Sequence, residues 1–224
     1  MRLIAWLVPS TAPDSRSSST TMNRSLSCAV TEKLRAEGHR PYFIPGGGSN
    51  ATGALGYASC AQEIAMQTQA TGQTFDWLVM ATGSTGTQAG LVAGFHAIGL
   101  DLPVMGVSVR QPRERQVDAV HGLTKKTLEK LGAPSIPASK ILVDDGYVGE
   151  GYGIPAPSTL EAISMAAKFE GLLLDPVYSA KGMAGLIGLI RQGFFKPTDN
   201  VLFLHTGGSV ALFAYEDQIL ARSA

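Results

Sequence analysis

Apolar runs recur along most of this chain, separated by longer stretches in which apolar and polar residues alternate. "FDWLVMAT" and "LPVMGVSV" are continuously hydrophobic, "KILVDD" and "NVLFLH" are shorter, and "RPYFIP" is interrupted by prolines. Apolar runs of this length, bounded by turn residues, are typical of strands buried on both faces of a sheet. We therefore expect a strand at each of these places.

The stretches between these runs have the spacing of amphipathic or buried helices, and some close at a glycine such as Gly38 or Gly132. The expected helices cover residues 29–38, 50–70, 87–99, 113–132, 158–174, 180–195 and 210–219. Strands that alternate with helices of this length predict an α/β fold, a parallel sheet with helices on both faces.

The start of the chain has a different composition. Residues 8–27 are rich in Ser, Thr and Pro and poor in large apolar residues, which is typical of a segment that does not order itself. We expect residues 1–27 to be a disordered or mistranslated tail and residues 28–224 to form the α/β domain. The short apolar run near Met1 is below the roughly 7–15 residues of a signal-peptide core.

Charge and cysteine content narrow the class of partner and the compartment. Eighteen basic and eighteen acidic residues cancel, so net charge favours neither nucleic acid nor an anionic membrane. No stretch reaches the roughly 18–20 apolar residues of a membrane span. Cys28 and Cys60 match neither a disulfide framework nor a metal-ligand spacing, which indicates a reducing, cytoplasmic setting. A small molecule or another protein is the expected partner.

A glycine-containing loop follows the run "FDWLVMAT" and leads into a helix. Gly83 and Gly86 allow close backbone approach, and Ser84, Thr85 and Thr87 add hydroxyl groups. Backbone N–H groups and the positive end of a helix dipole make such a loop a phosphate cradle. A tight strand-to-helix turn with a Thr cap is the alternative explanation.

Two further glycine loops are less clear. In "PGGGSNATG", residues 45–53, Ser49 or Asn50 is at least as well suited to cap the next helix as to contact a ligand. The loop "TGGS", residues 206–209, follows a strand, so it and residues 82–87 should converge at the carboxyl ends of the sheet.

Taken together and in order, five motifs resemble one family. They are "YFIPGGGSNATGALGY", "ATGSTGTQAGL", "GEGYGIP", "EGLLLDPVYSAKGMAGLI" and "LFLHTGGSVALFAY", spread over residues 28–220. This set resembles the pyridoxal-phosphate enzymes of the D-cysteine desulfhydrase and 1-aminocyclopropane-1-carboxylate deaminase family, which includes L-cysteate sulfo-lyases. The resemblance implies the tryptophan synthase β type of fold (PLP fold type II), with pyridoxal 5'-phosphate as cofactor and a homodimer as the full-length assembly.

The resemblance also implies roles for individual residues. Gly83, Ser84, Thr85, Gly86 and Thr87 would bind the cofactor phosphate, Tyr178 would be the active-site tyrosine, and Tyr152 a second aromatic near the substrate. The deaminases carry Glu after the first tyrosine, where this chain has Ser179. Ser179 or Thr206, each with a neutral hydroxyl, would then meet the pyridine nitrogen.

A neutral hydroxyl at that nitrogen favours elimination of a good leaving group over opening of a cyclopropane ring. The expected activity is that of a carbon–sulfur lyase performing α,β-elimination. D-cysteine would give pyruvate, sulfide and ammonia, and L-cysteate would give pyruvate, bisulfite and ammonia. Deamination of 1-aminocyclopropane-1-carboxylate is an alternative.

The family's Schiff-base lysine, in a "GGNK" context, and its "SNH" segment are not found in this sequence. One lobe is therefore expected to be incomplete, and a non-catalytic remnant that binds the cofactor is the competing hypothesis. Lys181 is expected to be a solvated helix-face residue rather than a replacement. An unrelated nucleotide binder is disfavoured, because Gln88 stands where a Walker motif has lysine and no G-x-G-x-x-G fingerprint is present.

Other chemically interesting residues have simpler explanations. His205 adjoins a predicted ligand loop, and packing is favoured there over proton transfer. Asp144, Asp145 and Glu150 are expected in a solvated loop rather than at a metal, for which no residues are predicted. Asp175, before a proline, is expected to terminate a helix.

Overall fold

The computed structural model describes residues 19–220, with side chains from Cys28 onward. Its first element is the helix α1 (Ser19–Ala36), which begins inside the segment expected to be a tail. A helix that has already nucleated extends at low cost, because each further residue adds one backbone hydrogen bond. The other residues of the expected tail, 1–18, lie outside the described part of the chain.

The four strands β1 (Trp77–Thr82), β2 (Val104–Ser108), β3 (Leu142–Asp144) and β4 (Val201–Leu204) form one sheet. Their order is β3-β2-β1-β4 and every pairing is parallel. The expected parallel α/β sheet is therefore confirmed. Thr82 pairs with Ser108 at the carboxyl end of the two central strands, and this end positions the site described below.

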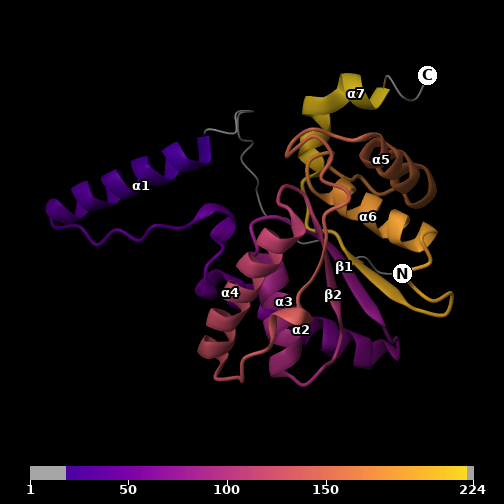
Figure 1. Ribbon diagram of the computed structural model, residues 1–224, viewed down its shortest axis with the longest axis horizontal. Helices are drawn as coiled ribbons and strands as arrows, with labels where there is room; N and C mark the ends of the chain where they lie inside the picture. The colour runs from indigo at the N-terminus through magenta and orange to yellow at the C-terminus, as the bar shows by residue number, and fades with distance from the viewer. Residues whose placement is uncertain (1–18, 221–224) are drawn as a thin grey trace.

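The strand expected from "RPYFIP" is not formed. Residues 39–45 have no regular structure and run from α1 back to the body of the molecule, away from the sheet (Figure 1). Pro41 and Pro45 lack the N–H that a strand ladder requires, so apolar content alone did not predict the structure here. Tyr42, Phe43 and Ile44 are exposed.

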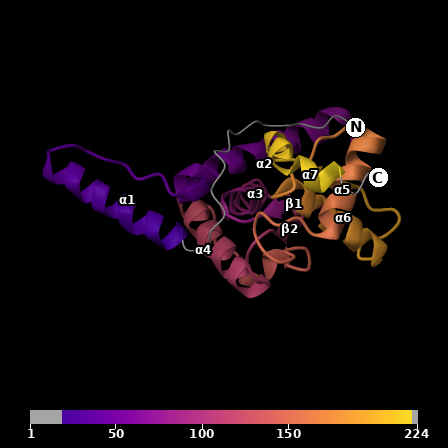
Figure 2. The same ribbon diagram turned by 90° about the horizontal axis from the view of Figure 1, so that it is seen from above.

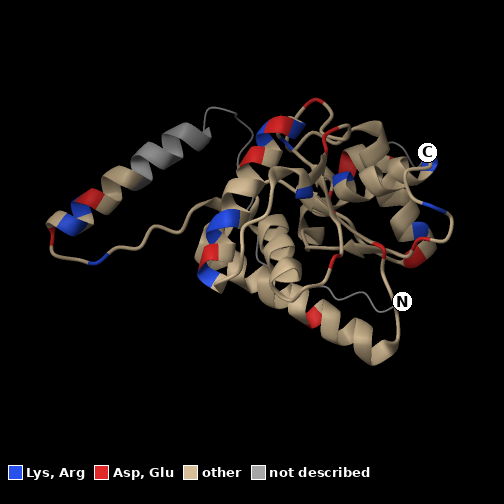
Figure 3. Cartoon of the chain, turned by 60° about the horizontal axis from the view of Figure 1, so that its bottom comes forward, with Lys and Arg blue, Asp and Glu red and all other residues tan. Residues whose placement is uncertain are grey.

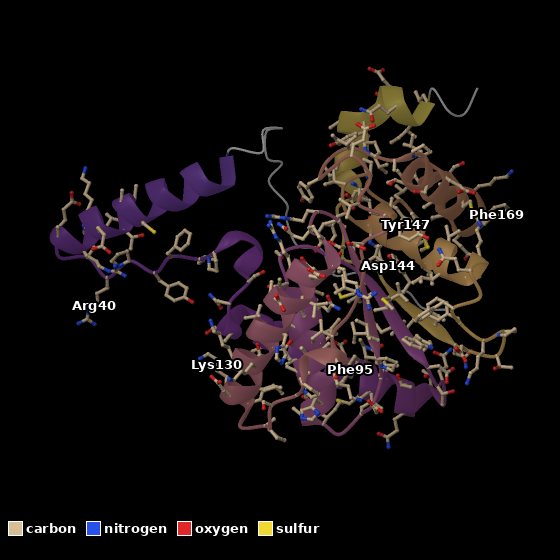
Figure 4. The ribbon with its side chains drawn as sticks, viewed as in Figure 1. Arg40, Phe95, Lys130, Asp144, Tyr147 and Phe169 are labelled. Carbon is tan, nitrogen blue, oxygen red and sulfur yellow. The ribbon has the colours of Figure 1, made fainter. Side chains whose placement is uncertain are left out.

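Helices cover both faces of the sheet, as expected. Figure 2 shows α2, α3 and α4 on one side of β1 and β2, and α5 and α6 on the other. The bounds are α2 (Ala51–Thr71), α3 (Gly86–Ala97), α4 (Arg113–Leu131), α5 (Pro157–Glu170) and α6 (Ser179–Arg191). Each face has its own apolar cluster, one around Leu78 and Phe95 and the other around Val79 and Leu174. Phe95 is labelled within the body in Figure 4.

The helices α2 and α3 approach each other closely at two glycines. A Cβ added to Gly90 would lie 2.3 Å from the carbonyl oxygen of Ala54, and one added to Gly94 would lie 2.7 Å from Cα of Ala58. Neither position has room for a side chain, so these glycines allow the close packing of α3 on α2.

Several helix ends follow local signals. Asn50 caps α2 by accepting from the Gly53 N–H at 2.8 Å. The helix α5 ends at Gly171, whose φ of 65° is left-handed, so it is shorter than the expected helix to residue 174. At the carboxyl terminus, the expected helix is mostly a 3-10 helix, η3 (Ser209–Tyr215), followed by the short α7 (Glu216–Leu220). Two shorter 3-10 turns are η1 (Gly46–Gly48) and η2 (Ala138–Lys140).

Charged residues of both signs lie along α1 and α4, whereas α3 carries no Lys, Arg, Asp or Glu (Figure 3). Among the described residues, no helix is both long enough and apolar enough to cross a bilayer.

Candidate active site

The loop after β1 has a strained backbone. Thr85 has a φ of 78° and is the only non-glycine residue with a positive φ in the described part of the chain. A β-branched residue is a true outlier in this region, and such strain concentrates at functional sites. Thr85 directly precedes α3, so the first N–H groups of that helix, which have no earlier turn to bond to, point into the loop.

The two glycine loops nearest the sheet edge touch each other. A Cβ added to Gly47 would lie 2.5 Å from Ser84 Oγ, and the Gly86 N–H donates to Ser49 Oγ at 3.3 Å. Asn50, not Ser49, caps α2. Residues 46–50 therefore pack against the 83–87 loop, which comprises the residues after β1 and the first two residues of α3. They also lead into α2, which Asn50 caps.

Tyr178 lies against this loop from the other side. A Cβ added to Gly83 would lie 3.1 Å from Tyr178 Cε2 and 3.0 Å from Val109 Cγ2, so only glycine fits there without displacing its neighbours. A backbone hydrogen bond from Ser84 reaches the Tyr178 hydroxyl. Burial, followed by the nearby Tyr152, Tyr57 and Asp175, raises the pKa of Tyr178 far above its usual range, so the phenol keeps its proton.

Asp175 lies just before the turn that leads into α6 and does not end a helix, so that expectation is wrong. Its Oδ1 accepts from the N–H groups of Val177 and Tyr178 at 2.9 and 2.6 Å. Its Oδ2 accepts from the N–H and the hydroxyl of Ser179 at 2.8 and 2.6 Å. The carboxylate is buried, and four donors converge on it in the turn that leads into α6.

These bonds restrict what Ser179 can do. Its Oγ also accepts from the Asp175 N–H at 2.8 Å, and the residue is 1% exposed. The one O–H of Ser179 is therefore already donated, and only a lone pair remains for another partner.

The loop after β4 packs on the same carboxylate. A Cβ added to Gly208 would lie 2.6 Å from Asp175 Oδ2, which places the loop that carries Thr206 beside Asp175 and Ser179. His205 accepts the Gly207 N–H at Nδ1 and contacts the Leu173 carbonyl through Nε2, at 3.1 and 3.2 Å. Both ring nitrogens are thus bonded within the fold, which agrees with the expected packing role.

Tyr152 lies on the Gly-rich loop between β3 and α5. Its side chain is 47% exposed. Burial and then the charge of Asp175 raise the pKa of Tyr152, whereas the cation of Arg110 acts in the opposite direction. The phenol of Tyr152 also contributes to the raised pKa of Tyr178, so the two tyrosines are near each other.

Lys181 is not solvated, and the expectation that it would be is wrong. The residue is 0% exposed, and its Nζ donates to the carbonyls of Val148 and Gly151, both at 2.6 Å. Loss of water around the ammonium lowers the pKa of Lys181.

Sequence reasoning missed the parts played by Arg110, Asp175 and Lys181. One signal for Lys181 was present, because it is a single charge in the otherwise apolar start of the helix "SAKGMAGLIGLI". The spacing of Asp175 and Ser179 around the first helical turn was a signal for a cap. Nothing in the sequence places Arg110, which follows β2 by two residues, near Tyr152.

The acidic residues that might suggest a metal have local roles. Asp144 accepts the Gly146 N–H and Asp145 accepts the Arg113 N–H, both at 2.8 Å. Asp144 and the nearby Tyr147 are labelled in Figure 4. Within residues 19–220, no cluster of three or more His, Cys, Asp or Glu is placed to hold a metal ion.

The arrangement fits the phosphate and ring of a phosphorylated cofactor. The 83–87 loop has a strained backbone, helix N–H groups and two glycines at which an added Cβ would lie only 3.0 Å from its nearest neighbour, and a protonated tyrosine borders it. The Ser179 hydroxyl, which is bonded to Asp175, lies at the start of α6 directly after Tyr178. These features are those expected of a phosphate site at the carboxyl ends of the strands in an α/β protein.

The comparison with protein families identifies which class this is. A family model described as "Pyridoxal-phosphate dependent enzyme" matches residues 15–207. The chain belongs to this family of pyridoxal-phosphate-dependent enzymes.

Known relatives are similar over most of the chain. D-cysteine desulfhydrase of Yersinia enterocolitica is 45% identical over 190 residues, which cover 85% of this chain and 57% of the relative. D-cysteine desulfhydrase of Serratia proteamaculans is 43% identical over the same shares. The chain thus spans 57% of the length of these relatives.

Solved structures agree on the fold. The crystal structure of a homologue of ACC deaminase matches with a TM-score of 0.80 at 33% identity, covering 93% of this chain and 61% of that one. A structure of O-ureido-L-serine synthase matches with a TM-score of 0.52 at 16% identity, which shows the fold alone. The expected fold type II architecture is confirmed.

Proposed function

We propose that this chain is part of a pyridoxal-phosphate-dependent carbon–sulfur lyase that performs α,β-elimination on a cysteine-like amino acid. The observation that carries the proposal is the contact between Tyr178 and the strained 83–87 loop. It places a protonated phenol directly beside the predicted phosphate cradle. Similarity to D-cysteine desulfhydrases supports the choice of reaction.

Each residue of the site has a part in this proposal. Gly83 to Thr87 would hold the phosphate through backbone N–H groups and the helix dipole. Thr206 would donate its hydroxyl to the ring nitrogen, because the single O–H of Ser179 is already donated to Asp175 and Ser179 could only accept a hydrogen bond there. When bound, the cofactor acts as an electron sink for charge at the substrate α-carbon.

The two tyrosines would handle protons and orientation. Tyr178 stays protonated at neutral pH, so its Oη can donate a hydrogen bond next to the cradle, although its raised pKa makes it a weak acid for proton transfer. Such a hydrogen bond would stabilise the negative charge that develops on a departing sulfur group. Tyr152, on the opposite loop and half exposed, would contact the substrate.

The substrate is D-cysteine or L-cysteate. The names of the relatives favour D-cysteine. Arg110 favours L-cysteate, because it is exposed, lies near Tyr152 and forms none of the salt bridges found among the described residues. A guanidinium suits the sulfonate of L-cysteate but not a thiol. For the whole protein we propose a cytoplasmic homodimer; the two free cysteines support the compartment and the family resemblance supports the dimer.

The second candidate function is cofactor binding without catalysis. It is favoured by Lys181, the lysine nearest to Tyr178 in the sequence, because its ammonium is held by two backbone carbonyls. Deamination of 1-aminocyclopropane-1-carboxylate is less favoured, because Ser179 stands where that activity would call for Glu.

One experiment separates these functions. The purified chain is mixed with pyridoxal phosphate, and the visible absorption band of a lysine-linked cofactor is recorded. Pyruvate is then measured after adding D-cysteine or L-cysteate. With 1-aminocyclopropane-1-carboxylate the product measured is 2-oxobutyrate. The lyase proposal predicts the band and pyruvate from a sulfur substrate. Binding that is reversed by dialysis, with neither band nor pyruvate, supports the non-catalytic alternative for this chain.

A further inference from the structure

The loop that carries Tyr152 has little to hold it in place by itself. Gly149 and Gly153 have φ values of 66° and 82°, which glycine adopts easily but which leave the segment flexible in the absence of other bonds. The backbone hydrogen bonds at its ends are long, at 3.4 Å from the Val148 N–H and 3.3 Å from the Ile154 N–H. The position of Tyr152 must therefore come from contacts outside the loop.

Lys181 provides the first of these contacts. Its ammonium donates to the carbonyls of Val148 and Gly151, both at 2.6 Å, and is fully buried. It forms no ion pair with a carboxylate among the described residues, so these two carbonyls are its recorded partners. Hydrogen bonds from a charged donor are about twice as strong as neutral ones, and more so when water is excluded.

Tyr215 provides the second contact from another element. Its hydroxyl, at the end of η3, donates to the Gly153 carbonyl at 2.7 Å. Tyr152 therefore lies between two fixed carbonyls, those of Gly151 and Gly153, while its own ring remains half exposed.

Lys181 and Tyr178 both lie at the start of α6. Lys181 follows Tyr178 by one helical turn at the start of α6, so a single rigid element carries one tyrosine and fixes the loop of the other. We propose that Lys181 is a positioning residue that sets the place of Tyr152 relative to Tyr178. Its importance for catalysis rests on the proposed function, whereas the positioning itself does not.

The test uses the chain labelled with 3-fluorotyrosine, with Tyr152→Phe to assign the Tyr152 resonance. Lys181→Met keeps the apolar stem and removes the ammonium. The expected result is a shift of the Tyr152 ¹⁹F resonance toward that of free fluorotyrosine, together with amide exchange about 10- to 100-fold faster at residues 148–153 and unchanged in β1. Lys125→Met, at an exposed site on α4, should change neither.

The proposal is overturned if Lys181→Met leaves the resonance and the loop amides as in the wild type. It is also overturned if exchange accelerates equally in β1 and the loop, because Lys181 would then stabilise only the core. Should Lys181→Met not fold, Lys181→Gln, whose amide can reach one carbonyl, must give a local change of smaller size. No cofactor or substrate enters this measurement, so a failure of the lyase proposal would be seen separately in the pyruvate assay.

Discussion

The carboxylate of Asp175 accepts both the backbone N–H and the hydroxyl of Ser179, at 2.8 and 2.6 Å. This pair closes the turn that leads into α6 and fixes the direction of the Ser179 O–H. It also lies under the loop after β4, where Gly208 leaves no space for a side chain. The same buried carboxylate thus organises a helix start, a loop and a predicted cofactor contact.

Asp175→Asn should destabilise the fold strongly. The amide NH₂ would face the Ser179 N–H and hydroxyl, so buried donors would lose their acceptor. We expect the free energy of unfolding to fall by about 2–4 kcal/mol, measured by urea denaturation. Asp118→Asn, on an exposed face of α4, should change it by no more than about 0.5 kcal/mol. Equal effects of the two substitutions would contradict this role of Asp175.

Alkaline pH should destabilise the protein in part through Tyr178. Its pKa is raised in the fold above the ordinary value of 10.0, so both states keep the proton below that pH. Above it the unfolded state ionises first, and stability is lost by up to about 1.4 kcal/mol per pH unit.

Tyr178→Phe should make this alkaline loss smaller, as followed by urea denaturation between pH 9 and about pH 11. Tyr42→Phe, at a tyrosine 70% exposed on the segment after α1, is the matched control. If Tyr178→Phe leaves the pH dependence of stability as steep as in the wild type, the phenol is not buried as described.

Arg110 and Tyr152 should be linked through their charges. The guanidinium of Arg110 opposes the rise in the pKa of Tyr152 that burial and Asp175 produce. Arg110→Gln should therefore raise the pKa of Tyr152 further, which a pH titration of its Cζ resonance would measure. Arg115→Gln, elsewhere on the surface of α4, should leave the titration midpoint of Tyr152 unchanged. If Arg110→Gln lowers the pKa of Tyr152, the two groups do not face each other.

Substitution by alanine should change the free energy of unfolding in opposite directions at Gly90 of α3 and Gly122 of α4. Gly90→Ala forces a methyl group to within 2.3 Å of the Ala54 carbonyl oxygen and should cost about 1–3 kcal/mol of unfolding free energy. Gly122→Ala, on exposed α4 with nothing near the added methyl, should gain about 0.5–1 kcal/mol. Urea denaturation of both variants checks the prediction, and a stable Gly90→Ala would rule out the close packing of α2 on α3.

The sequence predicted well those features that depend on local patterns. Continuous apolar runs located β1 through β4, and the strand-loop-helix order located residues 83–87. The segment 40–45 was mispredicted because Tyr42, Phe43 and Ile44 favour a strand, while the prolines on either side prevent pairing.

Features that depend on contacts between distant segments could not be read in this way. Lys181 is separated from Val148 by 33 residues, and its burial follows only from how the β3–α5 loop folds over α6. Asp175 is followed by a proline that suggests a helix end, and its capping bonds became evident only with the geometry of the turn. The contact of Ser49 with Gly86 likewise joins two loops that the sequence presents as separate candidates.

The most direct test of the account is whether residues 83–87 bind the phosphate of pyridoxal phosphate. Equilibrium dialysis of the chain would compare pyridoxal phosphate with pyridoxal, in the wild type and in Gly83→Val, whose side chain would displace Tyr178 and Val109. We expect the wild type to prefer the phosphorylated form by at least about ten-fold, or about 1.4 kcal/mol, and Gly83→Val to lose that preference. Equal affinity of the wild type for the two compounds would contradict the account.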